Sequence, residues 1–267
     1  KTFTKIGKEI TIAVKQGGPD VVGNSRLRAL MAEARSENMP KDNVEKAIKR
    51  ALEKNQGDFK EVVFEGYGPH GIAYLVETAT DNNTRTVANV RSYFTKCGGS
   101  LGTSGSVSFM FDHKCVFRIK YQEGMDLDEL QLALCECDDD PEVFIEEQED
   151  KDENITKNVV IYGAYESYGA IQKYIEDNGY ELVSGGFERI PNVELKDVTP
   201  EQRETLDKLT GLLEDDDDVT NVYSTLKPAD WIMSSVQAAE DQAGKWAVVN
   251  MPALDDVDGA TNYANCG

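Results

Sequence analysis

The sequence predicts an α+β protein in which a small helical N-terminal domain precedes two ferredoxin-like α/β sandwich domains. Two observations lead to this fold class. In the first 56 residues apolar side chains recur at helical spacing in three short segments, and beyond Gly57 segments of strand and helix character alternate in a β-α-β-β-like order. The chain of 267 residues, 40% of them apolar, is long enough to bury the cores of two or three domains.

The helical domain is expected to span residues 1–56 and to hold three helices. The first covers residues 2–16 and ends at Gly17-Gly18-Pro19, the second is capped at Asn24-Ser25, and the third begins near Pro40. Short loops between amphipathic segments predict that the three helices pack around one core. The apolar side chains at helical spacing are Phe3, Ile6, Ile10, Ala13 and Val14, then Leu27, Leu30, Met31 and Ala34, then Val44, Ala47, Ile48, Ala51 and Leu52.

Beyond the linker Gln56-Gly57-Asp58, apolar periodicity and turn residues predict the order of strands and helices. Strands are expected at Glu61–Glu65, Ile72–Thr78, Val107–Phe111, Cys115–Tyr121, Val143–Glu147, Asn158–Tyr162, Tyr180–Val183, Phe187–Ile190 and Val219–Ser224. Helices are expected at Thr84–Cys97, after the cap Asp126, at Glu166–Asn178 and at Pro200–Glu214, with a turn at Asp112–Lys114. Residues 227–267 are expected to form a tail, in which Trp231–Gln242 has helical spacing.

Charge is distributed unevenly along the chain. The net charge is −21, yet residues 1–56 carry 12 lysines and arginines against 7 acidic residues, a net charge of +5, and the remainder carries −26. A basic segment on an acidic body favours an anionic partner for that segment, and an ordinary solvated surface is the alternative. The acidic run Asp215–Asp218, which follows an expected helix, is interpreted as a solvated loop, and contact with a metal or a basic partner is the less favoured alternative.

The glycine-rich stretch Glu65–Gly71 is expected to form an ordered turn before a strand. Arg85 then lies at the expected start of a helix, where free backbone N–H groups and the helix dipole favour a bound anion. Tyr67 in the turn could stack on a base. The alternative is that Tyr67 packs over the glycines and that Arg85 pairs with Glu65 or Asp81.

The sequence offers little catalytic chemistry. His70 and His113 lie in separate expected turns, and no P-loop, GxSxG or HExxH pattern occurs. The cluster Gly98–Gly102 follows a helix, whereas a phosphate-binding loop follows a strand. We therefore expect no enzyme, no catalytic or metal-binding residue and no cofactor. Five scattered cysteines indicate a reducing, cytoplasmic location, and no apolar run is long enough to span a membrane.

Several motifs resemble the YebC family of probable transcriptional regulatory proteins, to which the mitochondrial translational activator of cytochrome c oxidase is related. The similarity covers about residues 1–226. The motifs are Phe3-Thr4-Lys5-Ile6, Glu65-Gly66-Tyr67-Gly68-Pro69, Asp81-Asn82 with Arg85-Thr86-Val87, Gly98-Gly99 with Leu101-Gly102 and Gly105-Ser106-Val107, and Leu213–Tyr223. The basic lead-in of the family is absent, and Asn83 stands where the family tends to carry arginine.

This resemblance implies three domains, one inserted into another, and a cytoplasmic, non-catalytic role in association with nucleic acid. It divides the chain into the helical domain at residues 1–56, a middle domain at residues 60–114 plus 187–226, and an acidic inserted domain at residues 115–186. It also implies a role either in DNA-linked transcriptional control or in ribosome-linked translation.

The function expected from the sequence is that of a non-enzymatic, nucleic-acid-binding regulator of gene expression, with DNA as its partner. One alternative is a ribosome-associated translational activator that contacts rRNA or tRNA, and another is an acidic module that binds basic proteins. The residues expected to contact nucleic acid are Lys5, Lys8, Arg26, Arg28, Lys49, Arg50, Tyr67, Arg85, Arg91 and Lys96.

Overall fold

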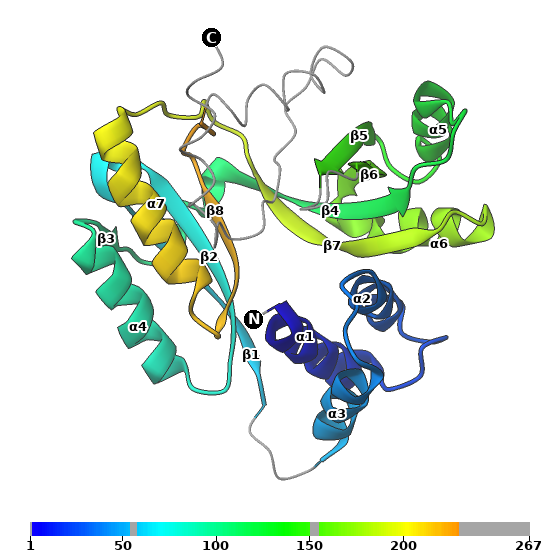
Figure 1. Cartoon of the computed structure of the whole chain (residues 1–267), viewed down its shortest axis with the longest axis horizontal. Coiled ribbons are helices and arrows are strands. Elements are labelled where there is room, and N and C mark those ends of the chain that lie inside the picture. Colours follow the sequence, from blue (N-terminus) through cyan, green and yellow to red (C-terminus); the bar gives the residue numbers. More distant parts are fainter. Residues whose placement is uncertain (1, 54–57, 150–154, 230–267) are drawn as a thin grey trace.

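The computed structural model describes residues 2–53, 58–149 and 155–229 and confirms the α+β class (Figure 1). The expected tail helix at Trp231–Gln242 lies outside the described residues. The three expected N-terminal helices are present as α1 (Thr2–Gly17), α2 (Ser25–Ser36) and α3 (Lys41–Leu52). Asn24 caps α2 because its side-chain oxygen accepts the Leu27 N–H at 3.0 Å. The core between the helices contains Ile6, Ile10, Leu27, Leu30, Ala34, Val44 and Ala47.

The first sheet has the strand order β3-β1-β2-β8, and all of its pairings are antiparallel. Its elements are β1 (Lys60–Tyr67), β2 (Ala73–Thr80), α4 (Asn83–Lys96), β3 (Ser100–Leu101), α7 (Pro200–Glu214) and β8 (Val219–Ser224). Helices α4 and α7 cover one face of the sheet (Figure 1). The buried side chains between them and the sheet include Phe64, Tyr74, Val76, Val90, Phe94, Leu206, Leu209 and Leu213.

The second sheet is formed by the residues between β3 and α7, so one α/β unit is inserted within the other. Its elements are β4 (Phe111–Lys120), α5 (Leu127–Leu134), β5 (Glu142–Glu149), β6 (Ile155–Ala164), α6 (Tyr168–Asp177) and β7 (Leu182–Pro191). The chain order β-α-β-β-α-β and the spatial order β5-β6-β4-β7 are those of a ferredoxin-like unit. Its core contains Phe117, Ile119, Leu130, Leu134, Val159, Ile161, Ile171 and Ile175.

Two segments differ from the sequence-based expectation. The expected strand Val107–Phe111 is a short 3₁₀ helix at Ser108–Met110, and the expected turn Asp112–Lys114 lies inside β4, paired with β7. The expected strands Tyr180–Val183 and Phe187–Ile190 are one continuous strand, β7. Strands β4 and β7 run unbroken through residues 114–115 and 186–187. The chain passes between the two sheets through residues 102–110, which lead from β3 to β4, and through residues 192–199, which lead from β7 to α7. The three domain boundaries stay a prediction.

Gly185, which lies between the two expected strands, has a packing role in β7. A Cβ atom at Gly185 would lie 2.8 Å from the ring of Phe117 and 3.2 Å from the methyl group of Ala29. The missing side chain therefore lets helix α2 of the N-terminal unit approach β7 of the inserted unit. Ala29 is accordingly buried in the core of the inserted unit.

The two glycine-rich turns pack against each other at the end of the first sheet. A Cβ atom at Gly99 would lie 2.5 Å from the carbonyl oxygen of Tyr67 and 3.0 Å from the Cα atom of Gly68. The Glu65 carboxylate accepts the backbone N–H groups of Gly105, Val107 and Ser108, each at 2.8 Å. Glu65 therefore holds this loop and is not a partner of Arg85.

Substitution of Gly99 by alanine is expected to destabilise the protein by about 1–3 kcal/mol, because the new methyl group meets backbone atoms that cannot rotate away. Gly211 in α7 is a matched control, since a Cβ atom there meets nothing within 4 Å. Gly211→Ala should stabilise the protein by up to about 1 kcal/mol through helix propensity. Urea unfolding of both variants measures the difference, and equal effects would contradict the proposed contact.

Candidate nucleic-acid interface

Asp218 lies at the centre of a charged network that joins the helical unit to the first sheet. The ammonium group of Lys8 donates to the Asp218 carboxylate at 2.9 Å, to the Asp217 carbonyl at 2.6 Å and to the Ala79 carbonyl at 3.3 Å. Arg85 donates to the same carboxylate at 2.7 Å. Only 5% of the Asp218 side chain is exposed. The interpretation of Asp215–Asp218 as a solvated loop is therefore wrong for Asp218.

The electrostatics of Asp218 follow from these contacts. Burial alone would raise the pKa of Asp218, but hydrogen bonds from Arg85, Lys8 and Thr86 outweigh burial and lower the pKa below its ordinary value. The Thr86 hydroxyl donates to the carboxylate at 2.9 Å. Asp218 therefore stays ionised although its side chain is almost fully buried, because Lys8 on α1 and Arg85 and Thr86 on α4 donate hydrogen bonds to its carboxylate.

Arg85 at the start of α4 was the centre of the expected anion site. In the structure the anion bound to Arg85 is the side-chain carboxylate of Asp218. Besides Asp218, Arg85 binds the Asp81 carboxylate at 3.1 Å. The backbone N–H of Arg85 donates to the Asn82 side chain, also at 3.1 Å, so Asn82 caps the helix. The residue types in the first turn of α4 indicated that it can bind a carboxylate, and in the structure it binds the carboxylate of Asp218.

Several other cations of the helical unit also bind groups of the rest of the chain. Arg26 pairs with Glu61 at 2.7 Å, and Arg28 pairs with Glu176 at 2.9 Å. The Lys5 ammonium donates to the carbonyl of Glu214 at 3.1 Å. Part of the positive charge of the helical unit is therefore used to dock that unit onto the acidic body.

Arg50 and Tyr67 are less exposed to solvent than residues that contact nucleic acid are expected to be. The Arg50 guanidinium lies 4.3 Å from the ring centre of Phe59 and 3.8 Å from the Asp81 carboxylate. Tyr67 is half-buried in β1 and packs on the cluster beneath the first sheet. Its ring contributes to a core that also contains Ala73, Leu75, Val107, Phe111 and Tyr223.

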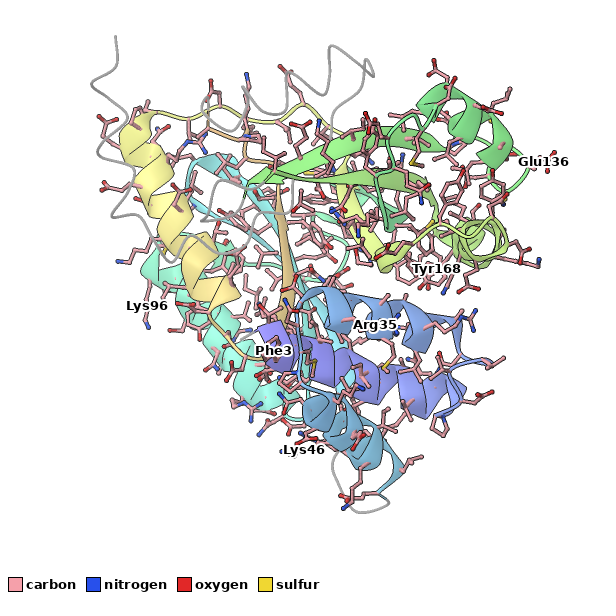
Figure 2. The ribbon with its side chains drawn as sticks, turned by 45° about the vertical axis from the view of Figure 1, so that its right-hand side comes forward. Phe3, Arg35, Lys46, Lys96, Glu136 and Tyr168 are labelled. Atoms are coloured by element: carbon pink, nitrogen blue, oxygen red, sulfur yellow. The ribbon has the colours of Figure 1, made fainter. Side chains whose placement is uncertain are left out.

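Three predicted residues, Lys49, Arg91 and Lys96, lie exposed on outer helix surfaces. Lys46, one turn before Lys49 on α3, is exposed as well and was not among the predicted contacts. Among the described residues none of these four side chains forms an ion pair, and Lys96 lies 5.9 Å from the ring centre of Tyr93. We call Lys46, Lys49, Arg91 and Lys96 the outer cations. Lys46 and Lys96 are labelled in Figure 2, where both lie on the outside of the molecule.

The end of α3 and the start of α4 lie at one edge of the molecule, and Arg91 and Lys96 lie further along α4. The end of α3 and the start of α4 are joined by Asp81, which lies between Arg50 and Arg85. Helix periodicity predicts which lysines are exposed, but it cannot tell which exposed lysines meet another unit. This is why the sequence placed Lys5 and Lys8 beside Lys49 and omitted Lys46.

No group of three or more His, Cys, Asp or Glu side chains in residues 2–53, 58–149 and 155–229 has the arrangement of a metal site. None of the described helices is long and apolar enough to cross a membrane.

Comparison with known proteins supports one family. A model described as the TACO1/YebC second and third domain matches residues 59–226, and one described as the TACO1/YebC protein N-terminal domain matches residues 1–54. A probable transcriptional regulatory protein of Parabacteroides distasonis is 58% identical over 230 residues, which cover 86% of this chain and 90% of that protein. A probable transcriptional regulatory protein of Flavobacterium johnsoniae is 54% identical over 227 residues, covering 85% of this chain and 91% of that protein.

A solved structure has the same fold. The crystal structure of the conserved hypothetical protein Aq1575 from Aquifex aeolicus aligns with a TM-score of 0.69 and 32% sequence identity. The alignment covers 85% of this chain and 90% of that one.

Lys8→Met is expected to lower the free energy of unfolding by about 3 kcal/mol, because it removes one partner of a buried ion pair. Lys49→Met is the matched control, since Lys49 is exposed and its replacement should change stability by no more than about 0.5 kcal/mol. Urea unfolding at neutral pH measures both values. A Lys8→Met effect as small as that of the control would contradict the role assigned to the network.

The same network predicts a pH dependence of stability. The folded-state pKa of Asp218 lies below its unfolded value of about 3.9, so ionised Asp218 stabilises the fold above that pH. This contribution is lost as pH falls through the folded-state pKa. The stability gap between the wild-type protein and Asp218→Asn should therefore be largest near neutrality and shrink below about pH 4. A gap that stayed constant on acidification would contradict this assignment.

Proposed function

The chain belongs to the TACO1/YebC family, and from this premise we propose that it is a non-enzymatic regulator of gene expression that binds nucleic acid in the cytoplasm through its outer cations. The names of the relatives support a regulatory role. The single observation that carries the binding surface is the presence of exposed cations on α3 and α4 that form no ion pair with any described residue, while Lys8, Arg26 and Arg28 are held by acidic partners.

The chemistry of the outer cations suits contact with the nucleic-acid backbone. Lysine and arginine side chains on outer helix faces can neutralise phosphates without reading bases. Tyr67, the aromatic residue considered for stacking, contributes to a core instead. We therefore infer that binding is mainly electrostatic and depends weakly on sequence.

The acidic body limits the surface that a nucleic acid can approach. The net charge of −21 opposes a polyanion, so a complex has to form on the edge that carries the outer cations and keep the inserted unit at a distance. Duplex DNA is the partner we propose, in line with the names of the relatives. Ribosomal RNA or transfer RNA presents the same phosphate chemistry and is the alternative partner.

Charge reversal of Lys46 and Lys49 to glutamate is expected to weaken duplex binding and to lower the salt dependence of affinity, by about one unit of log–log slope for each phosphate that is no longer neutralised. Fluorescence anisotropy with a labelled duplex over a range of salt concentrations measures both effects. The matched control is Lys120→Glu with Lys173→Glu on the inserted unit, where both side chains are exposed and the change in net charge is the same.

Each outcome of this experiment separates the candidate functions. Loss of binding in the α3 variant but not in the control supports the proposal, whereas equal loss in both indicates a general charge effect and contradicts the proposed surface. Co-sedimentation with ribosomes at physiological salt, without retention of duplex DNA, would assign the protein to translation. Retention on neither would favour the third candidate, an acidic module that binds basic proteins. Turnover of a nucleotide or ester that is lost when the Gly66–Gly71 turn is altered would overturn the non-enzymatic role.

A further inference from the structure

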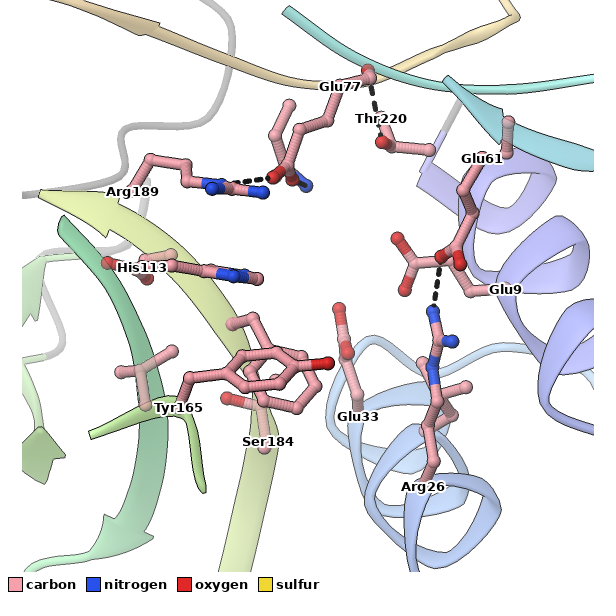
Figure 3. Close-up of a pocket in the computed structure, with 18 of the residues that line it drawn as sticks. Glu9, Arg26, Glu33, Glu61, Glu77, His113, Tyr165, Ser184, Arg189 and Thr220 are labelled. Carbon is pink, nitrogen blue, oxygen red and sulfur yellow. Dashed lines mark hydrogen bonds and ion pairs between the residues drawn. The ribbon is translucent and has the colours of Figure 1, made fainter. Parts of the chain in front are cut away.

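A cavity of about 320 Å³ lies where the helical unit and the two sheets meet. Figure 3 shows side chains reaching it from several elements. Glu9 and Glu33 come from α1 and α2, Glu77 from β2, and His113 and Arg189 from β4 and β7. The cavity is distinct from the outer cations, which lie on α3 and α4.

The charged groups of this cavity do not balance. Five glutamates and three arginines line it. Each arginine binds a glutamate of this lining, because Arg26 binds Glu61 at 2.7 Å, Arg189 binds Glu77 at 3.0 Å and Arg118 binds Glu188 at 3.3 Å. Arg118 also binds Glu146, at 3.0 Å. The two glutamates left over are Glu9 and Glu33.

Glu9 and Glu33 point into the cavity from neighbouring helices (Figure 3). Neither carboxylate accepts a hydrogen bond from any described residue of the chain. Burial, followed by the charge of Glu33, raises the pKa of Glu9 to about 8, and burial, followed by the charge of Glu37, raises the pKa of Glu33 to about 7. Both side chains are partly exposed to the cavity, and two acidic groups that accept no hydrogen bond from the protein would be stabilised there by a partner of opposite charge.

The opposite wall of the cavity is aromatic. His113 and Tyr165 have ring centres 4.5 Å apart, and Tyr165 and Phe187 have ring centres 4.8 Å apart. Burial, with repulsion from Arg189, lowers the pKa of His113 to about 4, so its ring is neutral at physiological pH. A neutral aromatic wall that faces two unpaired carboxylates is a surface that suits an organic cation, through apolar contact and cation–π attraction.

The arrangement favours an organic cation over a metal ion. No three acidic, histidine or cysteine side chains within the described part of the chain converge as metal ligands, at this cavity or elsewhere. Primary ammonium groups carry three N–H donors and can reach two carboxylates at once. We propose that the cavity binds a small aliphatic amine whose ammonium group lies between Glu9 and Glu33 and whose carbon chain lies against His113 and Tyr165.

Isothermal titration calorimetry with putrescine tests this proposal. The neutral isostere 1,4-butanediol is the ligand control, since it has the same length and no charge. Putrescine is expected to bind and the diol is not. The variant with both Glu9→Gln and Glu33→Gln should bind putrescine at least about tenfold more weakly, the equivalent of about 1.4 kcal/mol. Glu45→Gln on the exposed side of α3 is the matched protein control and should bind like the wild type.

The double variant is expected to fold, because glutamine keeps the side-chain shape and removes two buried charges; circular dichroism and thermal unfolding check this. Absence of putrescine binding at millimolar concentrations, or binding by the double variant within about twofold of the wild type, would overturn the proposal.

The pH dependence of binding provides a second readout. The charged groups around Glu9 are Arg26 and Glu33 on α2, Glu61 on β1 and Glu77 on β2. Those around Glu33 are Glu37, which directly follows α2, and Arg118 on β4. An ammonium group favours the ionised carboxylates, so binding should release protons near neutral pH and become tighter between about pH 6 and about pH 8.5. Titrations in two buffers of different ionisation enthalpy measure the released protons. Affinity and proton release that are the same in the wild type and the double variant would overturn the proposal.

Discussion

The ion pair between Lys8 and Asp218 is the contact on which the arrangement of the units depends. The ammonium group and the carboxylate come from opposite ends of the described chain, and at 2.9 Å they join helix α1 to the loop before β8. Arg85 and Thr86 bind the same carboxylate, so α4 is attached to the same point. Desolvation of such a cluster is costly unless each charge keeps its partners, and the four groups therefore favour one geometry over others.

Charge complementarity extends this arrangement over the whole inner side of the helical unit. Arg26 meets Glu61 on the first sheet, and Arg28 meets Glu176 on the inserted unit. These pairs are partly exposed, and each adds little stability by itself. Together they orient the helical unit on two different sheets, while the apolar contact of Ala29 with Gly185 and Phe117 supplies close packing. Part of the positive charge near the N-terminus therefore serves to dock the helical unit on the two sheets, and the rest faces outward.

The inner and outer sides of the helical unit consequently offer different chemistry. The outer sides of α3 and α4 carry lysine and arginine side chains in contact with solvent, which suits a polyanion. The inner sides of α1 and α2 contribute Glu9 and Glu33 to a cavity closed by the two sheets, which suits a small cation. Because the cavity is lined by all three units, a molecule bound there would contact the same junction that positions the outer cations.

Local patterns in the sequence determined the fold class and most elements, because helix periodicity, caps and turn glycines act over a few residues. The three N-terminal helices, the ferredoxin-like order and the family motifs around Gly66 and Gly99 follow from such patterns. The continuity of strand β7 did not, because the reason for a glycine at position 185 is visible only once helix α2 is known to pack against it. Tertiary structure likewise decided which charged side chains form ion pairs within the protein and which face solvent. Lys8 and Lys49 both lie on amphipathic helices of the basic segment, but only the three-dimensional fold brings Asp218, some two hundred residues away in sequence, to Lys8 and leaves Lys49 in solvent.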